Sequence, residues 1–139
     1  MIQFQIPLNP VGKKNSQQIL KGKGGRPFIA QGKRYKDYEK ACLQYLPFLP
    51  EPIDYPVNIQ CVYYRDSKRR VDKTNLEEAI LDILVQGGVI TDDCRDVVAT
   101  TDGSIVLYDK AYPRTEITIE SLEERGVVYE QWKAKDTKS

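Results

Sequence analysis

The chain has 139 residues, of which 40% are hydrophobic and 29% charged, which is the balance of a globular domain rather than of a membrane or disordered protein. Its 21 basic and 20 acidic residues leave a net charge of +1, so total charge alone gives no argument for nucleic acid. The sequence has no histidine, which excludes Ser-His-Asp and Cys-His catalysis, and its three scattered cysteines favour neither a disulfide framework nor a zinc site. The first residues lack a basic region followed by a long apolar stretch, so we expect a cytoplasmic protein.

The first third of the chain combines a strand signal, basic loops and a helix signal. Apolar and polar residues alternate over residues 2–6 and predict a strand. A turn-rich basic loop follows at residues 9–16, and the glycine-rich basic segment 21–26 is either the tip of a hairpin or a flexible arm. Residues 33–46 carry an apolar stripe at helical spacing, which is usually core, although tyrosines also stack on unpaired bases. The stripe consists of Tyr35, Tyr38, Ala41, Cys42 and Tyr45.

The rest of the chain predicts a long strand, a second helix and further strands. Alternation over residues 57–64 gives the long strand, which leads through a basic loop into a helix over residues 74–86. We expect a tight turn or bulge at Asp102–Gly103, a short helix after Gly126, and one domain over residues 1–139. The expected fold is α+β, a mixed β-sheet of about four to five strands with two main helices packed on it. An apolar segment at residues 97–99 precedes two more predicted strands at residues 105–107 and 116–119.

The helix predicted over residues 74–86 has clear signals along its face and at both ends. Apolar side chains at i, i+3, i+4, i+7 and i+8 indicate that one face packs on a core. Thr74 and Glu77 have the spacing of a capping box, and Gly87–Gly88 is a stop signal. The apolar face comprises Leu76, Ala79, Ile80, Ile83 and Leu84.

Acidic residues flank this helix at both ends. Asp72 lies just before its start and Asp92–Asp93 follow its end, and a helix of this length is about 20 Å long. The acids meet only if the chain doubles back after the glycines, with Val89–Ile90 as the return segment. Carboxylates set among basic residues have the composition of a Mg²⁺ site that cleaves phosphodiesters, whereas Asp72 alone is also suited to cap the helix.

Three polar residues lie on one flank of the apolar face. Asn75, Glu78 and Asp82 cluster there, and the like charges of Glu78 and Asp82 at i, i+4 cost a few tenths of a kcal/mol unless a cation lies nearby. The alternative is that these acids, with Glu77, form the solvated face of a surface helix.

Basic residues are concentrated in two places, while glutamates gather near residues 116–130. This polarity favours a basic surface that faces DNA, and the alternative is a solvated, lysine-rich loop. The first cluster contains Lys13, Lys14, Lys21, Lys23, Arg26, Lys33, Arg34, Lys36 and Lys40, and the second contains Arg65, Lys68, Arg69, Arg70 and Lys73.

The spacing of residues around the second helix resembles the signature of the RusA family of Holliday-junction resolvases, which are endonucleases of bacteria and their prophages. By position, Asp72 matches the first acid of the family's Asp-x-Asp-Asn motif, Asn75 its asparagine, and Asp93 the second acid of a later pair. Thr74 stands where the best-known member has the second motif acid, and Glu78 stands where it has a functionally important lysine. The matching run is Asp72, Asn75, Leu76, Ala79, Asp82, Leu84, Gly88 and Asp92–Asp93.

The resemblance implies a Mg²⁺-dependent homodimer that binds four-way DNA junctions and nicks two strands symmetrically. Its acids would hold an ion that activates water and stabilises charge on the scissile phosphate. Lys73 or Lys110 would replace the missing lysine, and Asp96 is a further substitute for the missing acid. The implied catalytic residues are Asp72, Asp93, Asp92 and Asn75, the metal ligands Asp72, Asp93, Asp92, Glu78 and Asp82, and the DNA contacts Lys13, Lys14, Arg69, Arg70, Lys73 and Lys110.

Two other functions stay open at this point. The departures at Thr74 and Glu78 are compatible with a RusA-like module that binds branched DNA without cutting it. Clustered acids without histidine also suit a metal-dependent hydrolase of free nucleotides, for which the basic segment from Lys13 to Arg26 would be dispensable.

Overall fold

The computed structural model describes residues 1–13, 17–21 and 27–125. Five strands form one sheet in the order β1-β7-β4-β5, with β6 beside β4 on the same edge as β5. β7 pairs antiparallel with both β1 and β4, whereas β5 and β6 run parallel to β4. The strands are β1 (Ile2–Ile6), β4 (Val57–Arg65), β5 (Val98–Thr100), β6 (Ile105–Tyr108) and β7 (Arg114–Ser121).

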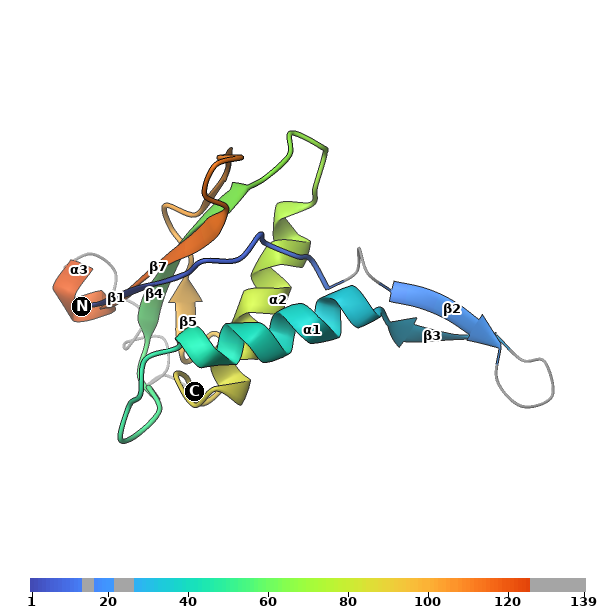
Figure 1. Cartoon of the computed structure of the whole chain (residues 1–139). Coiled ribbons are helices and arrows are strands. Elements are labelled where there is room, and N and C mark those ends of the chain that lie inside the picture. Colours follow the sequence, from blue (N-terminus) through green and yellow to red (C-terminus); the bar gives the residue numbers. More distant parts are fainter. Residues whose placement is uncertain (14–16, 22–26, 126–139) are drawn as a thin grey trace.

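Two helices pack on one face of this sheet, α1 (Lys33–Cys42) and α2 (Lys73–Gln86) (Figure 1). α2 is the crossover from β4 to the parallel strands β5 and β6, since a parallel connection requires a segment that returns along the sheet. The predicted α+β fold, a mixed sheet with two main helices, is confirmed. No helix in the described ranges is long and apolar enough to cross a membrane.

The core lies between the sheet and the helices because alternate residues of the strands point toward α1 and α2. On β4 the residues Ile59, Cys61 and Tyr63 are buried, and their partners on β7 are buried with them. The whole predicted apolar face of α2 is buried, which confirms that α2 packs on the core. The buried residues of that face are Leu76, Ala79, Ile80, Ile83 and Leu84.

The first helix is shorter than the sequence pattern predicts. α1 ends at Cys42 and continues as the 3₁₀ helix η3 (Leu43–Tyr45), so Tyr45 is 42% exposed, while Tyr35 and Tyr38 are buried. The prediction of a core position for Tyr45 was therefore wrong. Proline disfavours helical backbone in the preceding residue, and Leu46 before Pro47 is extended.

A two-stranded hairpin of β2 (Gln17–Lys21) and β3 (Pro27–Gln31) projects away from the sheet and helices (Figure 1). This outcome favours the hairpin over the flexible arm for the strands themselves, while the basic tip at residues 22–26 lies outside the described residues. The short helix α3 (Leu122–Arg125) precedes the segment after Gly126, where another helix was predicted; that segment also lies outside the described part of the chain.

The predicted turn at Asp102–Gly103 joins β5 to β6. Gly103 has a φ of +86°, which favours glycine, and the buried Asn58 of β4 holds the turn. Asn58 Oδ1 accepts a hydrogen bond from the Asp102 backbone N–H at 2.7 Å, and its Nδ2 donates to the Asp102 carbonyl at 3.2 Å. The turn therefore lets two short strands follow one another along the same edge of β4.

Candidate functional site

Asp72 is the N-cap residue of α2. Its backbone is extended, and its Oδ1 accepts a hydrogen bond from the backbone N–H of Thr74 at 3.0 Å. The predicted capping box with Thr74 as cap was wrong, and α2 begins at Lys73, one residue earlier. Aspartate is a better N-cap than threonine, and Glu77 instead lies 3.8 Å from the Lys73 ammonium. The exposed carboxylate of Asp72 is thus fixed at the positive end of a helix.

The loop after β1 ties the end of β4 to the start of α2. The Asp66 backbone N–H donates to Asn9 Oδ1 at 2.9 Å, and the Lys13 backbone N–H donates to the Asn75 carbonyl at 3.5 Å. The side chain of Asn75 is 6% exposed, and its Oδ1 has no hydrogen-bond partner among the described residues. Asn75 is therefore buried in the first turn of α2, and within the described part of the chain its side-chain oxygen is an unused hydrogen-bond acceptor.

Lys13 is the cation that the acidic flank of α2 requires. Its Nζ lies 2.6 Å from Asp82 Oδ2, and this hydrogen bond raises the pKa of Lys13, with Glu39 and Glu78 adding to the effect. Lys13 and Asp82 had been predicted as a DNA contact and a metal ligand, and in this structure they bind each other. An ammonium has three N–H donors and a carboxylate two oxygens, so this contact occupies only part of each group.

Asp92 and Asp93 lie at the other end of α2 from Asp72. The return segment does form, but it leads to the start of β4, because the Ile53 backbone N–H donates to the Val89 carbonyl at 2.9 Å. The Val57 backbone N–H donates to Val97 at 2.8 Å, which keeps the intervening loop at that end. Asp72 follows the far end of β4, about 20 Å away along the 14 residues of α2.

The described residues of one chain therefore contain no ready metal centre. No three acidic, cysteine or histidine side chains within residues 1–13, 17–21 and 27–125 lie close enough together to hold an ion. Asp92 Oδ1 accepts from the Asp93 backbone N–H at 2.7 Å, and Asp96 lies 3.7 Å from Arg95. The predicted ligands are thus spread along α2, with Asp72 before its start, Glu78 and Asp82 within it, and Asp92 and Asp93 after its end.

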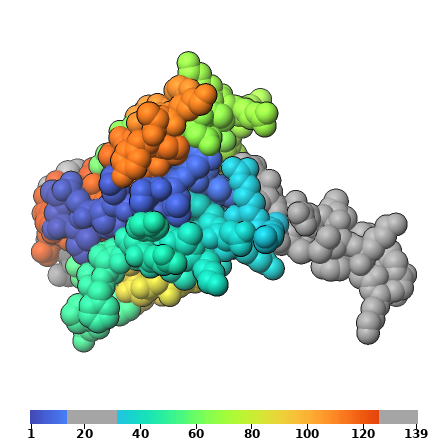
Figure 2. Space-filling view, in the orientation of Figure 1, coloured from blue at the N-terminus to red at the C-terminus, as the bar shows by residue number. Residues whose placement is uncertain are grey.

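Most of the predicted DNA contacts lie at the Asp72 end. Arg69 and Arg70 are exposed in the loop before α2, and Lys73 is exposed in its first turn. Lys110 is exposed in the loop after β6, which lies beside the end of β4 because the Asp109 backbone N–H donates to the Arg65 carbonyl at 2.9 Å. Figure 2 shows these two loops, green and orange, side by side at one end, and the yellow segment after α2 at the opposite end. Lys14 lies outside the described residues.

A family model described as endodeoxyribonuclease RusA matches residues 7–120, which include α1, α2 and strands β4 to β7 except the last residue of β7. The chain belongs to the RusA family. Membership confirms the resemblance seen in the sequence and implies a junction-resolving endodeoxyribonuclease with branched DNA as its substrate. No curated protein is similar enough to match the chain.

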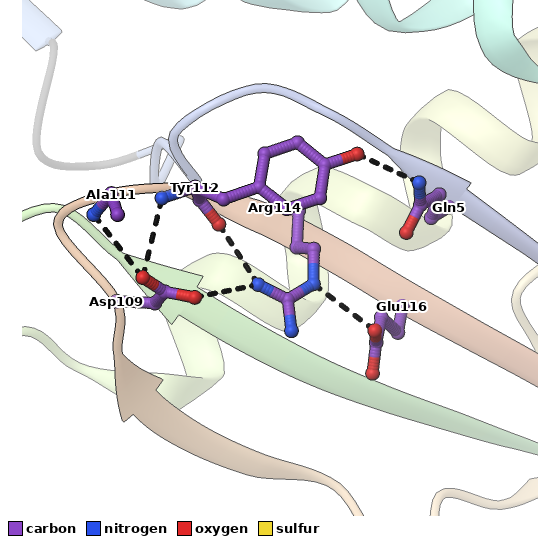
Figure 3. Close-up of polar contacts among 6 residues, drawn as sticks. All are labelled: Gln5, Asp109, Ala111, Tyr112, Arg114 and Glu116. Atoms are coloured by element: carbon purple, nitrogen blue, oxygen red, sulfur yellow. Dashed lines mark hydrogen bonds and ion pairs between the residues drawn. The ribbon is translucent and has the colours of Figure 1, made fainter.

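In this RusA-family chain, Arg114 organises the loop that carries Lys110, a role that the sequence analysis missed (Figure 3). Arg114 Nη1 donates to Asp109 Oδ2 at 2.9 Å and its Nε donates to Glu116 at 3.0 Å, while the guanidinium lies 3.7 Å from the centre of the Tyr64 ring. Asp109 Oδ1 accepts from the backbone N–H groups of residues 111 and 112, and Arg114 holds the pKa of Asp109 below its usual value. An aspartate opening a loop that ends in proline is the only local signal of this turn.

Proposed function

We propose that this chain is a Mg²⁺-dependent Holliday-junction resolvase that acts as a homodimer and cuts by paired, symmetric nicks. The observation that carries the proposal is the RusA match, together with the position of Asp72 at the basic end of α2. The exposed cations around Asp72 would contact phosphates of the DNA backbone, which gives affinity without reading sequence.

The proposed metal site requires two chains. Mg²⁺ prefers an octahedron of hard oxygen ligands, and the described acids of one chain do not fit a shared ion because α2 separates them by about 20 Å. We therefore place the ion between Asp72 of one copy and Asp92 and Asp93 of the second copy. Two-fold symmetry then creates two equal sites in a dimer, as paired nicks require. Glu78, about 9 Å along α2 from Asp72, completes the proposed ligand set, whereas Asp82, about 15 Å along the helix, is too far from Asp72 to share the same ion.

Asn75 has a positioning role in this proposal. Its backbone N–H donates to the Asp72 carbonyl at 3.1 Å, and its side chain is buried within the first turn of α2. A rigid residue at this place keeps Asp72 in one orientation, which is how supporting residues tune a ligand.

Mixed dimers test the shared site. Asp72→Asn and Asp93→Asn should each abolish cleavage of a labelled four-way junction. A mixed dimer of the two variants, purified through different tags, keeps one intact site if the acids come from different copies, so it should place a single nick in the presence of Mg²⁺. If all acids of a site came from one copy, the mixed dimer would stay inactive.

Metal binding gives a second measure that does not depend on catalysis. Calorimetric titration with Mn²⁺ should show binding by the native protein, loss in each single variant and about half the sites in the mixed dimer, as two symmetric sites require. Asp37→Asn, which alters an exposed aspartate of α1, is the control and should bind normally. Sedimentation that shows only monomer at micromolar concentration would refute the dimer.

The same junction experiment separates the two other functions. Tight binding without nicks by the native protein would identify a non-cleaving module, which the departures at Thr74 and Glu78 would explain. If junctions were neither bound nor cut, hydrolysis of free nucleotides would be tested next, and deletion of residues 13–26 should leave such an activity unchanged.

A further inference from the structure

A pocket of 310 Å³ opens between the loop that follows β4 and strand β6. It lies beside the candidate site, because one of its walls is Val71, the residue directly before Asp72. The lining residues are Arg65, Ser67, Lys68, Arg69, Arg70, Val71, Val106, Leu107 and Tyr108.

The charge of this pocket has one sign. Four lining side chains are cationic, and no acidic residue is among the lining residues. Arg65 Nη1 donates to the Arg69 carbonyl, which shapes the loop, while the buried Nε of Arg65 has no hydrogen-bond partner among the described residues. A phosphate is the anion that several convergent guanidinium and ammonium groups suit best.

The opposite wall is apolar and aromatic, which a phosphate alone would not require. Leu107 is 40% exposed and Tyr108 is 45% exposed, and both belong to β6. The Lys68 ammonium lies 5.1 Å from the centre of the Tyr108 ring, a cation–π contact at an exposed site. Stacking of a base on an aromatic ring is generally stronger than such a contact, so a base can replace Lys68 on the ring and leave the ammonium free to meet a phosphate.

We infer that this pocket is a subsite for one unpaired nucleotide of branched DNA, with its phosphate on the basic wall and its base stacked on Tyr108. The inference rests on the proposed function and adds a residue that distinguishes branched DNA from duplex. Bases inside a duplex already have both faces covered by their neighbours, whereas a base at a branch point has a free face. Tyr108 therefore increases the affinity for branched DNA only, whereas the cations increase the affinity for any DNA.

Binding without cleavage tests the subsite. In EDTA, the affinities of the native protein and of Tyr108→Ala are measured by fluorescence anisotropy for a junction with unpaired bases at its branch point and for a linear duplex. Tyr108→Ala should lose about 5-fold or more in affinity for the junction and nothing for the duplex, while Tyr108→Phe should bind as the native protein does. The matched control is Tyr45→Ala, because Tyr45 is equally exposed, at 42%, and belongs to η3, which packs against the far end of α2 at Gly87.

Photocrosslinking from 5-iodouracil at the branch point gives an independent measure. The crosslinked peptide should contain Tyr108. Equal loss for junction and duplex, an unchanged junction affinity in Tyr108→Ala, or a crosslink elsewhere would overturn the subsite while native cleavage still supported the resolvase. A native protein that neither bound nor cut junctions would overturn the resolvase itself, and the subsite with it.

Discussion

Asp72 has one structural role and one proposed catalytic role, and two substitutions can separate them. As N-cap it accepts one hydrogen bond from the Thr74 backbone, and as a carboxylate it is a proposed ligand. Asp72→Ala removes both the acceptor and the charge. Asp72→Asn keeps an acceptor of the same shape and removes only the charge, since asparagine and aspartate are about equally good N-caps.

The expected stability changes follow from this geometry. Loss of an N-cap acceptor typically costs about 1 kcal/mol, which for a chain of this length lowers Tm by about 3 °C. Loss of the charge alone removes only its interaction with the helix dipole, about 0.3 kcal/mol for an exposed carboxylate when salt screens the interaction. We therefore expect Asp72→Ala to lower Tm and Asp72→Asn to leave it nearly unchanged.

Calorimetry and junction cleavage, measured on the same preparations, check the two roles. Both variants should fail to nick a labelled four-way junction in Mg²⁺, although only one is less stable. If Asp72→Ala had the same Tm as the native protein, the capping role would be refuted. If Asp72→Asn cut junctions at the native rate, the catalytic role would be refuted.

Three further predictions concern stability and thiol chemistry. Gly88 has a φ of +73° with open space around it, so Gly88→Ala should cost about 1 kcal/mol in urea denaturation through backbone strain alone, and Gly88→Asn should cost less. At pH 8, Ellman's reagent should titrate only exposed Cys94 in the native protein, because burial shields Cys42 and Cys61 and raises their pKa to about 12. In denaturant it should titrate all three thiols. The unfolded chain loses these two protons near pH 9 and the folded chain keeps them, so their contribution to stability is complete below about pH 9 and is lost as pH rises toward 12. Urea midpoints that stayed constant from pH 8 to pH 11 would contradict that last prediction.

Local signals predicted the elements that place the site. The apolar periodicity of α2 shows which helix face is buried, and its two terminal glycines show where the helix ends. Both features lie within a short stretch of sequence, so the sequence alone predicts them. The start of α2 was misplaced by one residue because Asp72 and Thr74 both suit an N-cap, and the backbone of the preceding loop decides between them. α1 was extended too far because its apolar spacing continues to Tyr45, while the backbone preference before Pro47 ends the helix.

The sequence pattern did not predict contacts between residues that are far apart in the chain. The acidic flank of α2 predicted a cation, but its identity as Lys13, 69 positions from Asp82, depends on how the loop after β1 crosses the helix. Likewise, nothing local indicates that β5 and β6 pair with the same strand. The return after Gly88 was predicted, and its direction was set by Ile53, which binds it to the start of β4.

The hydrogen bond that caps α2 does not depend on the side chain at position 74. The contact that position 74 makes with Asp72 comes from its backbone N–H, which every residue except proline supplies. That bond occupies Oδ1 and leaves Oδ2 without a hydrogen bond from the described residues, so Asp72 is oriented and still has a free oxygen. Replacing an acid at position 74 therefore removes one carboxylate and keeps the group that orients the other. A second copy that supplies Asp92 and Asp93 would then restore the number of oxygen ligands, so the variant motif does not by itself argue against cleavage.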